Sequence, residues 1–110
     1  MITYQDFEKV IICSGTVVDA QPFPQARKPA YKIWVDFGPE LGIKKTSAQV
    51  TVHYTPETLI GRQTMGIVNF PPKNIAGFES EFLLCGFADE QGAIILAVPE
   101  QVVPNGKKLH

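Results

Sequence analysis

The stretch Asn69-Phe70-Pro71-Pro72-Lys73-Asn74-Ile75-Ala76-Gly77-Phe78-Glu79-Ser80-Glu81 separates two apolar segments that are typical of strands, residues 64–70 and 82–87. Proline fixes φ and lacks an amide hydrogen, so Pro71 and Pro72 must end the first strand, which we expect to reach Phe70. Gly77 permits a backbone turn. The sequence therefore predicts a stiff polar loop between two strands, and this loop is either a binding element or a structural turn with a solvated tip.

The composition of the chain is that of one globular domain, residues 1–110. Its hydrophobic content is 45% and its charged content 19%, while nine glycines and nine prolines indicate many short connections and favour an all-β fold. Cys13 and Cys85 lack metal-ligand spacing, and no apolar run approaches the 18 or so residues that a membrane span needs. No basic region followed by an apolar run opens the chain. We therefore expect a cytoplasmic protein with reduced thiols and no membrane insertion.

The charges are unevenly distributed along the chain. The net charge is only −1, which argues against coating nucleic acid by bulk charge. Half of the ten basic residues nevertheless lie between positions 27 and 45, a span of nineteen residues with two acids. Residues 89–100, by contrast, hold three acids and no base. This pattern indicates either a basic face that attracts phosphates or a pair of solvated loop ends. The basic segment consists of Arg27, Lys28, Lys32, Lys44 and Lys45.

Three segments in the first half of the chain are typical of strands. Residues 12–20 form the first, with Gly15 as a candidate bulge. Residues 31–37 alternate so that Trp34 lies on the outer face, where it is a subunit contact, an RNA-stacking platform or a partly covered residue. Residues 44–53 alternate again. The inward set is predicted to be Ala48, Val50 and Val52, and the outward set includes Lys45, Ser47 and Gln49.

Two short helices accompany the strands. Thr3 and Asp6 are predicted to cap a helix that runs to Val10. A second helix is expected from Thr55-Pro56-Glu57 to Gly61, between the third and fourth strands, as in an oligonucleotide-binding (OB) barrel. The remaining strands are placed at residues 62–70, 82–87 and 93–98, with Met65 and Ile67 in the core.

Motifs of catalysis and of metal binding are missing from the sequence. It contains no Gly-rich phosphate loop, HExxH, GxSxG or CxxC. Glu79 and Glu81 are interpreted as solvated loop carboxylates rather than an acid/base pair. We therefore expect a binding protein that is not an enzyme, with no cofactor and no metal site.

Several sequence blocks occur together in an order that resembles the tRNA-binding domain family. They are "FPQAR", "SAQ" and "NFPPKNIAGFESE", and the similarity runs from about Phe7 to the C-terminus. The blocks are most similar to those of the CsaA-type secretion chaperones within this family. The resemblance implies a five-stranded OB-fold Greek-key barrel, a homodimer, binding of tRNA-like structured RNA, and binding of unfolded preproteins. Ile11 and Cys13 stand where the family usually has Asp and Arg, so the role of that arginine does not transfer.

The leading hypothesis is a homodimeric binder of tRNA, with an export-related chaperone as the alternative and an accessory partner of an aminoacyl-tRNA synthetase as a third. The predicted dimerisation elements are the N-terminal helix and the apolar tail 99–110, in which Asn105-Gly106 is expected to turn the chain back. The predicted interface residues are Trp34, Val102, Val103 and Leu109. The predicted RNA-binding residues are Arg27, Lys28, Lys32, Lys44, Lys45, Ser47, Gln49, Asn69, Lys73 and Ser80.

Overall fold

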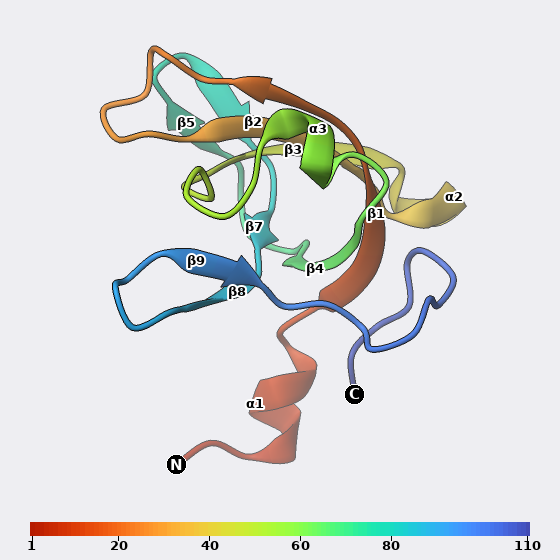
Figure 1. Ribbon diagram of the computed structural model, residues 1–110. Helices are drawn as coiled ribbons and strands as arrows, with labels where there is room; N and C mark the ends of the chain where they lie inside the picture. The colour runs from red at the N-terminus through yellow and green to blue at the C-terminus, as the bar shows by residue number, and fades with distance from the viewer.

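A computed structural model describes all 110 residues, and its centre is an antiparallel five-stranded sheet that curls into a nearly closed barrel (Figure 1). The sheet confirms the predicted all-β, OB-like architecture. Its strand order is β3-β2-β1-β4-β7. The strands are β1 (Ile12–Pro22), β2 (Tyr31–Asp36), β3 (Ile43–Ala48), β4 (Gln63–Ile67) and β7 (Leu83–Leu84).

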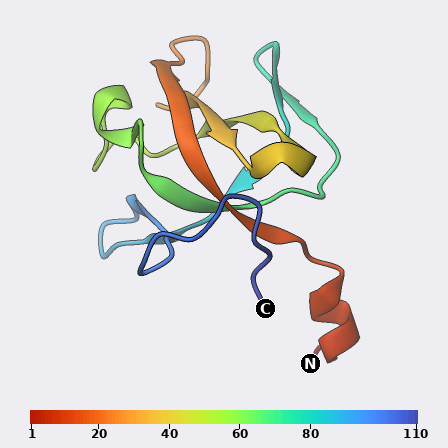
Figure 2. The same cartoon turned by 90° about the vertical axis from the view of Figure 1, so that its right-hand side faces the viewer.

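Two hairpins and three short helices surround this barrel. The hairpins are β5 (Lys73–Ile75) with β6 (Phe78–Ser80), and β8 (Gly86–Ala88) with β9 (Ile94–Leu96). The helices are α1 (Tyr4–Glu8), α2 (Gly38–Leu41) and α3 (Pro56–Leu59). Both chain ends lie at the bottom in both views, while the β5–β6 hairpin and the β1–β2 connection lie at the top (Figures 1 and 2).

The core confirms the predicted alternation of β2, because Ile33, Val35 and Phe37 are at most 1% exposed. The expectation for β4 was wrong: Thr64 and Gly66 are buried, whereas Met65 and Ile67 are half-buried. Aromatic rings explain this exchange. A Cβ on Gly66 would lie 2.7 Å from the Phe82 ring and 3.0 Å from that of Phe37, so the inner face of β4 must carry small residues.

The bend in β1 is displaced from its predicted position. The register with β2 shifts between Val17 and Asp19, so the bulge is not at Gly15. Gly15 serves close packing instead, because an added Cβ would lie 2.5 Å from Val35 Cγ1. The bulge increases the local twist and bends the strand around the barrel.

The predicted polar loop after β4 is itself a hairpin. β4 ends at Ile67, three residues before the expected end, and the chain from Lys73 to Ser80 pairs with itself as β5 and β6. Ala76 and Gly77 form its two-residue turn with φ of +50° and +83°. Residues 82–87 are likewise divided between β7 and β8 rather than forming one strand.

The third strand and its two neighbouring turns also differ from expectation. β3 ends at Ala48, and although Val50 is buried, Val52 is 73% exposed because the chain turns at residues 51–53. The turn before β3 contains α2. Both predicted helix starts are confirmed, since Thr3 with Asp6 and Thr55 with Thr58 form capping boxes, but α1 ends at Glu8 and buries no residue.

The C-terminal tail is hydrogen-bonded to the first half of β1. Ser14 N donates to Lys107 O (2.9 Å), Gly106 N to Ser14 O (2.7 Å) and Leu109 N to Ile12 O (2.7 Å). The predicted turn at Gly106 is present, with φ of +87°. The tail is therefore an integral part of the barrel edge, while Val102 projects outward and is 88% exposed.

Two further observations bear on the kind of protein this is. None of the helices is long and apolar enough to cross a membrane. No cluster of three or more His, Cys, Asp or Glu side chains is arranged to hold a metal ion.

Candidate nucleic-acid interface

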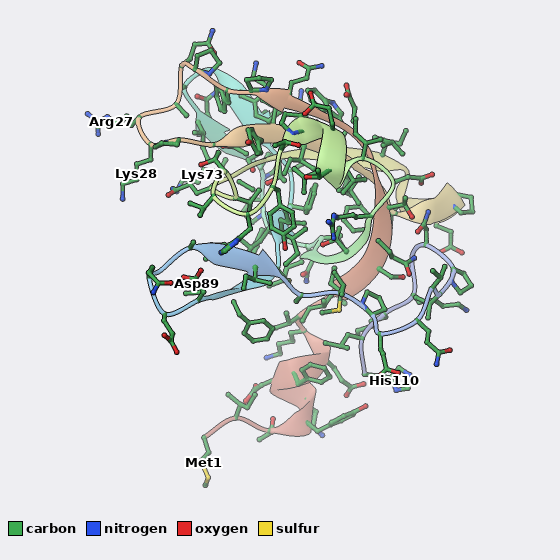
Figure 3. All side chains as sticks on the ribbon, in the orientation of Figure 1. Met1, Arg27, Lys28, Lys73, Asp89 and His110 are labelled. Atoms are coloured by element: carbon green, nitrogen blue, oxygen red, sulfur yellow. The ribbon has the colours of Figure 1, made fainter.

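A groove of about 1050 Å³ opens between the β1–β2 connection, the end of β3 and the β5–β6 hairpin. In OB barrels the loops after the first and fourth strands flank the oligonucleotide-binding face, and these are the two connections that form the groove walls here. Half of the predicted RNA-binding residues line it, namely Arg27, Lys28, Ser47, Gln49 and Lys73. Arg27, Lys28 and Lys73 lie on the same side of the molecule, far from Met1 and His110 (Figure 3).

The cations of the groove have no acidic partners. Within 4.0 Å, the only contacts between a basic and an acidic side chain join Lys9 to Asp6 (3.8 Å) and His53 to Asp89 (2.7 Å). No carboxylate is among the groove-lining residues, and Arg27, Lys28 and Lys73 are exposed. Unpaired positive charge in a concave surface concentrates field lines and attracts anions.

The rest of the lining is apolar or carries neutral polar groups. Aliphatic side chains from all three walls contribute, and no aromatic ring is present. Cys85 also lines the groove, and partial burial raises the pKa of its thiol, so the group is neutral at physiological pH. The aliphatic members include Ala48, Val50, Ile75 and Leu84.

A second hollow of about 680 Å³ adjoins the groove and shares Ser47 and Lys73 with it. Pro71 and Pro72 form part of its wall. Ser80 lines this hollow, but its hydroxyl is already engaged, 2.8 Å from Thr46 Oγ1 and accepting from Ser47 N at 3.3 Å. Ser80 therefore holds β6 against β3 beside the candidate site.

Asn69 is not brought into either hollow. Its Oδ1 accepts from Ile11 N (3.1 Å) and its Nδ2 donates to Lys9 O (2.7 Å), so it fixes the connection between α1 and β1. The predicted role of Asn69 in RNA binding stays a prediction. No sequence signal indicates this contact, because its partners lie about 60 residues away.

Lys44 and Lys45 lie on opposite faces of β3, because successive side chains of a strand alternate. Lys45 shares its face with Trp34, its register partner on β2. Lys44 lies on the face of buried Thr46 and lines neither hollow. The basic segment of the sequence is thus divided rather than continuous.

Trp34 is half-buried under the β5–β6 hairpin. Its ring centroid lies 5.9 Å from that of Phe78, which also packs on Phe23 at 5.5 Å. The interpretation of Trp34 as a partly covered residue fits this contact, and its role in a subunit interface stays a prediction. Phe78 and Phe23 were not among the predicted site residues.

Glu81 is not the solvated loop carboxylate that the sequence predicted. Its Oε1 accepts from Lys45 N (3.0 Å), and its own N–H donates to Lys45 O (2.8 Å). These two bonds join β3 to the residue that follows the hairpin. Glu79, by contrast, is exposed as expected.

The family described as "Putative tRNA binding domain" matches residues 12–108. The chain belongs to this tRNA-binding domain family. The family resemblance noted in the sequence is thereby confirmed, and it covers the barrel from the start of β1 to the paired part of the tail.

Two solved structures of the CsaA chaperone are similar to this family member along its full length. The protein from Bacillus anthracis is 46% identical, with a TM-score of 0.93, and the alignment covers 100% of this chain and 99% of that one. The protein from Picrophilus torridus is 41% identical with a TM-score of 0.93, and both chains are fully covered.

Among curated proteins, the methionine–tRNA ligase of Porphyromonas gingivalis is 32% identical over 108 residues. This alignment covers 98% of the chain but only 15% of the ligase. The chain thus spans about 15% of the length of the curated relative it matches.

Proposed function

We propose that the chain binds tRNA or tRNA-like structured RNA without catalysis, through the groove between the β1–β2 connection and the β5–β6 hairpin. One observation carries the proposal: three cations without acidic partners converge on a hollow that contains no carboxylate. Membership of the tRNA-binding domain family supports RNA as the anion. A cytoplasmic location, where tRNA is found, is part of the same proposal.

The groove offers the two kinds of contact that RNA recognition uses. Arg27, Lys28 and Lys73 are suited to phosphates, and Arg27 can contact one in a bidentate manner. Ser47 and Gln49 supply neutral donors and acceptors for 2′-hydroxyls and exposed base edges. Nothing in this arrangement activates a nucleophile, so binding alone is the proposed task.

The proposal is tested by filter binding with total tRNA over a range of salt concentrations. Arg27→Ala, Lys28→Ala and Lys73→Ala should each weaken binding and reduce the slope of log K against log salt by about one unit. Lys9→Ala is the matched control, because Lys9 is exposed, paired with Asp6 and outside the groove. Parent affinity and slope in all three groove variants would refute the site.

A homodimer is the second part of the proposal, supported by apolar residues that the single chain leaves exposed. Phe87 and Ile95 are cross-strand partners on the β8–β9 hairpin and are 71% and 44% exposed. Val102 and Leu109 of the tail and Tyr4 of α1 are also exposed. The adjacent pair of Phe87 and Ile95 carries the argument, because contiguous exposed apolar surface marks interaction sites.

Deleting residues 99–110 would not test the dimer, because the tail pairs with β1 and its loss would damage the barrel. Charge placed on an exposed side chain is the better test. Val102→Asp and Phe87→Asp should produce monomers by light scattering with unchanged circular dichroism. Glu90→Lys, on the solvated β8–β9 turn, is the control, and dimers in every variant would remove these residues from the interface.

Binding of unfolded polypeptide is the alternative function, favoured by the similarity to the CsaA chaperones. An unfolded chain carries no regular phosphate charge and would use apolar surface. Lys73→Ala should then weaken tRNA binding while leaving suppression of client aggregation intact. If Lys73→Ala instead lost only the suppression of client aggregation, chaperone activity would be the primary function. Assistance to a synthetase is a third candidate, which a pull-down with methionine–tRNA ligase would reveal.

A further inference from the structure

Two lysines outside the groove are gathered on one aromatic ring. Lys32 Nζ lies 5.1 Å and Lys45 Nζ 5.3 Å from the centroid of Phe78. Lys32 Nζ also lies 4.9 Å from the centroid of Phe23. Cations at these distances are attracted by the negative face of the ring.

No carboxylate forms an ion pair with Lys32 or Lys45. Glu79 and Glu81 are the carboxylates next to Phe78 in sequence, yet neither forms an ion pair with a lysine nitrogen. Glu81 is directed to the backbone N–H of Lys45 instead. Two ammonium groups therefore share one ring despite their mutual repulsion, which a bound anion would relieve.

We propose that Phe78 positions Lys32 and Lys45 as a preformed clamp for RNA phosphate, separate from the groove. Both nitrogens lie within 5.3 Å of the same centroid, so an RNA strand that passes this ring can contact both through neighbouring phosphates. The inference rests on the proposed RNA-binding function and adds a second contact to it. Phe78 is a positioning residue, because it acts on the ligand through the lysines.

The clamp and the groove are built on the same two connections, so that one RNA can reach both. The β1–β2 connection contributes Arg27 and Lys28 to the groove lining, and Phe23 of the same connection supports the clamp. The β5–β6 hairpin likewise presents Lys73 to the groove and Phe78 to the lysines. The hairpin thus lies between two sets of unpaired cations.

Ring contact favours phosphate binding by limiting the freedom of long side chains. A lysine free in water loses its rotamer freedom when it meets a phosphate, whereas a lysine already held on a ring loses less. Leucine at position 78 would retain apolar cover for Trp34 but would remove the attraction for the ammonium groups. Tyrosine would retain both.

The experiment measures tRNA binding against salt for the full chain and four variants. Lys32→Met with Lys45→Met keeps the apolar stems and removes both charges, so the salt slope should fall by about two units. Phe78→Leu should lower the slope by about one unit. Phe78→Tyr should restore the parent slope. Lys107→Met with Lys108→Met removes two charges from the tail and should leave the slope unchanged.

A triple variant identifies how Phe78 acts. Adding Phe78→Leu to the Lys32→Met, Lys45→Met pair should change nothing further if Phe78 acts through the lysines. The clamp would be overturned if Phe78→Leu kept the salt slope of the parent protein. It would also be overturned if adding Phe78→Leu to the lysine pair lowered the slope as much as Phe78→Leu lowers it in the parent. If Phe78→Leu fails to fold, the two double variants still test the clamp. The clamp is then wrong if the slope falls no more in Lys32→Met, Lys45→Met than in Lys107→Met, Lys108→Met.

The proposed function and the clamp fail in different ways. If the parent protein itself does not bind tRNA, the proposed function is wrong. If the parent protein binds and the groove variants lose affinity while the clamp variants do not, only the clamp is wrong.

Discussion

Thr46 Oγ1 lies 2.7 Å from the carbonyl oxygen of Phe82, to which it donates, and this bond joins β3 to the chain that enters β7. It is the last of three linked hydrogen bonds: Ser47 N–H donates to Ser80 Oγ, and Ser80 Oγ lies 2.8 Å from Thr46 Oγ1. Thr46 is 1% exposed, so water cannot replace it. These bonds close the barrel on the side where the sheet order leaves a gap between β3 and β7.

Thr46→Val should therefore lower the free energy of unfolding. The substitution keeps the shape of the side chain but leaves the Phe82 carbonyl and the Ser80 hydroxyl without their partner. A buried group left unsatisfied costs about 1 to 3 kcal/mol. Urea denaturation followed by circular dichroism measures the change, and Thr46→Ser should recover most of it.

Thr64→Val is the matched substitution with the opposite expectation. Thr64 is 0% exposed, and its hydroxyl oxygen has no hydrogen-bond partner. Removing an unpaired buried hydroxyl removes its desolvation cost, so the free energy of unfolding should rise by about 1 kcal/mol. A loss comparable to that of Thr46→Val would mean that a bound water satisfies Thr64.

The sequence predicted those features that depend on neighbours along the chain. Alternation placed Ile33, Val35 and Phe37 inside, and local side-chain chemistry located the capped starts of α1 and α3. The predictions from sequence were wrong where contacts between residues far apart in the chain determine the structure. The inner face of β4 carries Thr64 and Gly66 because the rings of Phe37 and Phe82 occupy the space that a larger residue would need.

The candidate site shows the same division. The polar composition of the segment after β4 was compatible with a binding element or a structural turn, and Lys73 of this segment lines the groove. That Asn69 and Ser80 hold other parts of the barrel follows only from contacts made across the fold. The ring of Phe78 under Lys32 and Lys45 likewise depends on how the hairpin folds over β2 and β3.

Ala76→Asn should stabilise the β5–β6 hairpin. Ala76 and Gly77 both have positive φ, as a type I′ turn requires, and alanine is disfavoured in this conformation by about 1 to 2 kcal/mol. Asparagine tolerates it better, so we expect a gain of about 0.5 to 1 kcal/mol. Amide exchange of the hairpin would measure it. Ala26→Asn in the β1–β2 connection, where φ is not positive, is the control and should bring no gain.

Cys85 provides a direct probe of groove occupancy. It is half-buried in the groove lining, whereas Cys13, the only other cysteine, is 3% exposed. Burial raises the pKa of the Cys85 thiol, so little thiolate is present at neutral pH. Alkylation by iodoacetamide should therefore be slow at neutral pH and should accelerate as the pH rises above the usual thiol range.

If RNA fills the groove, tRNA at ten times its Kd should slow the alkylation of Cys85 about tenfold, because only the free protein reacts. Mass spectrometry of the peptide that contains Cys85 measures the rate, and Cys85→Ser confirms the assignment. Lys73→Ala should reduce the protection at the same tRNA concentration, whereas Lys9→Ala should not. An unchanged rate in saturating tRNA would show that bound RNA leaves the groove open and contacts another face of the barrel.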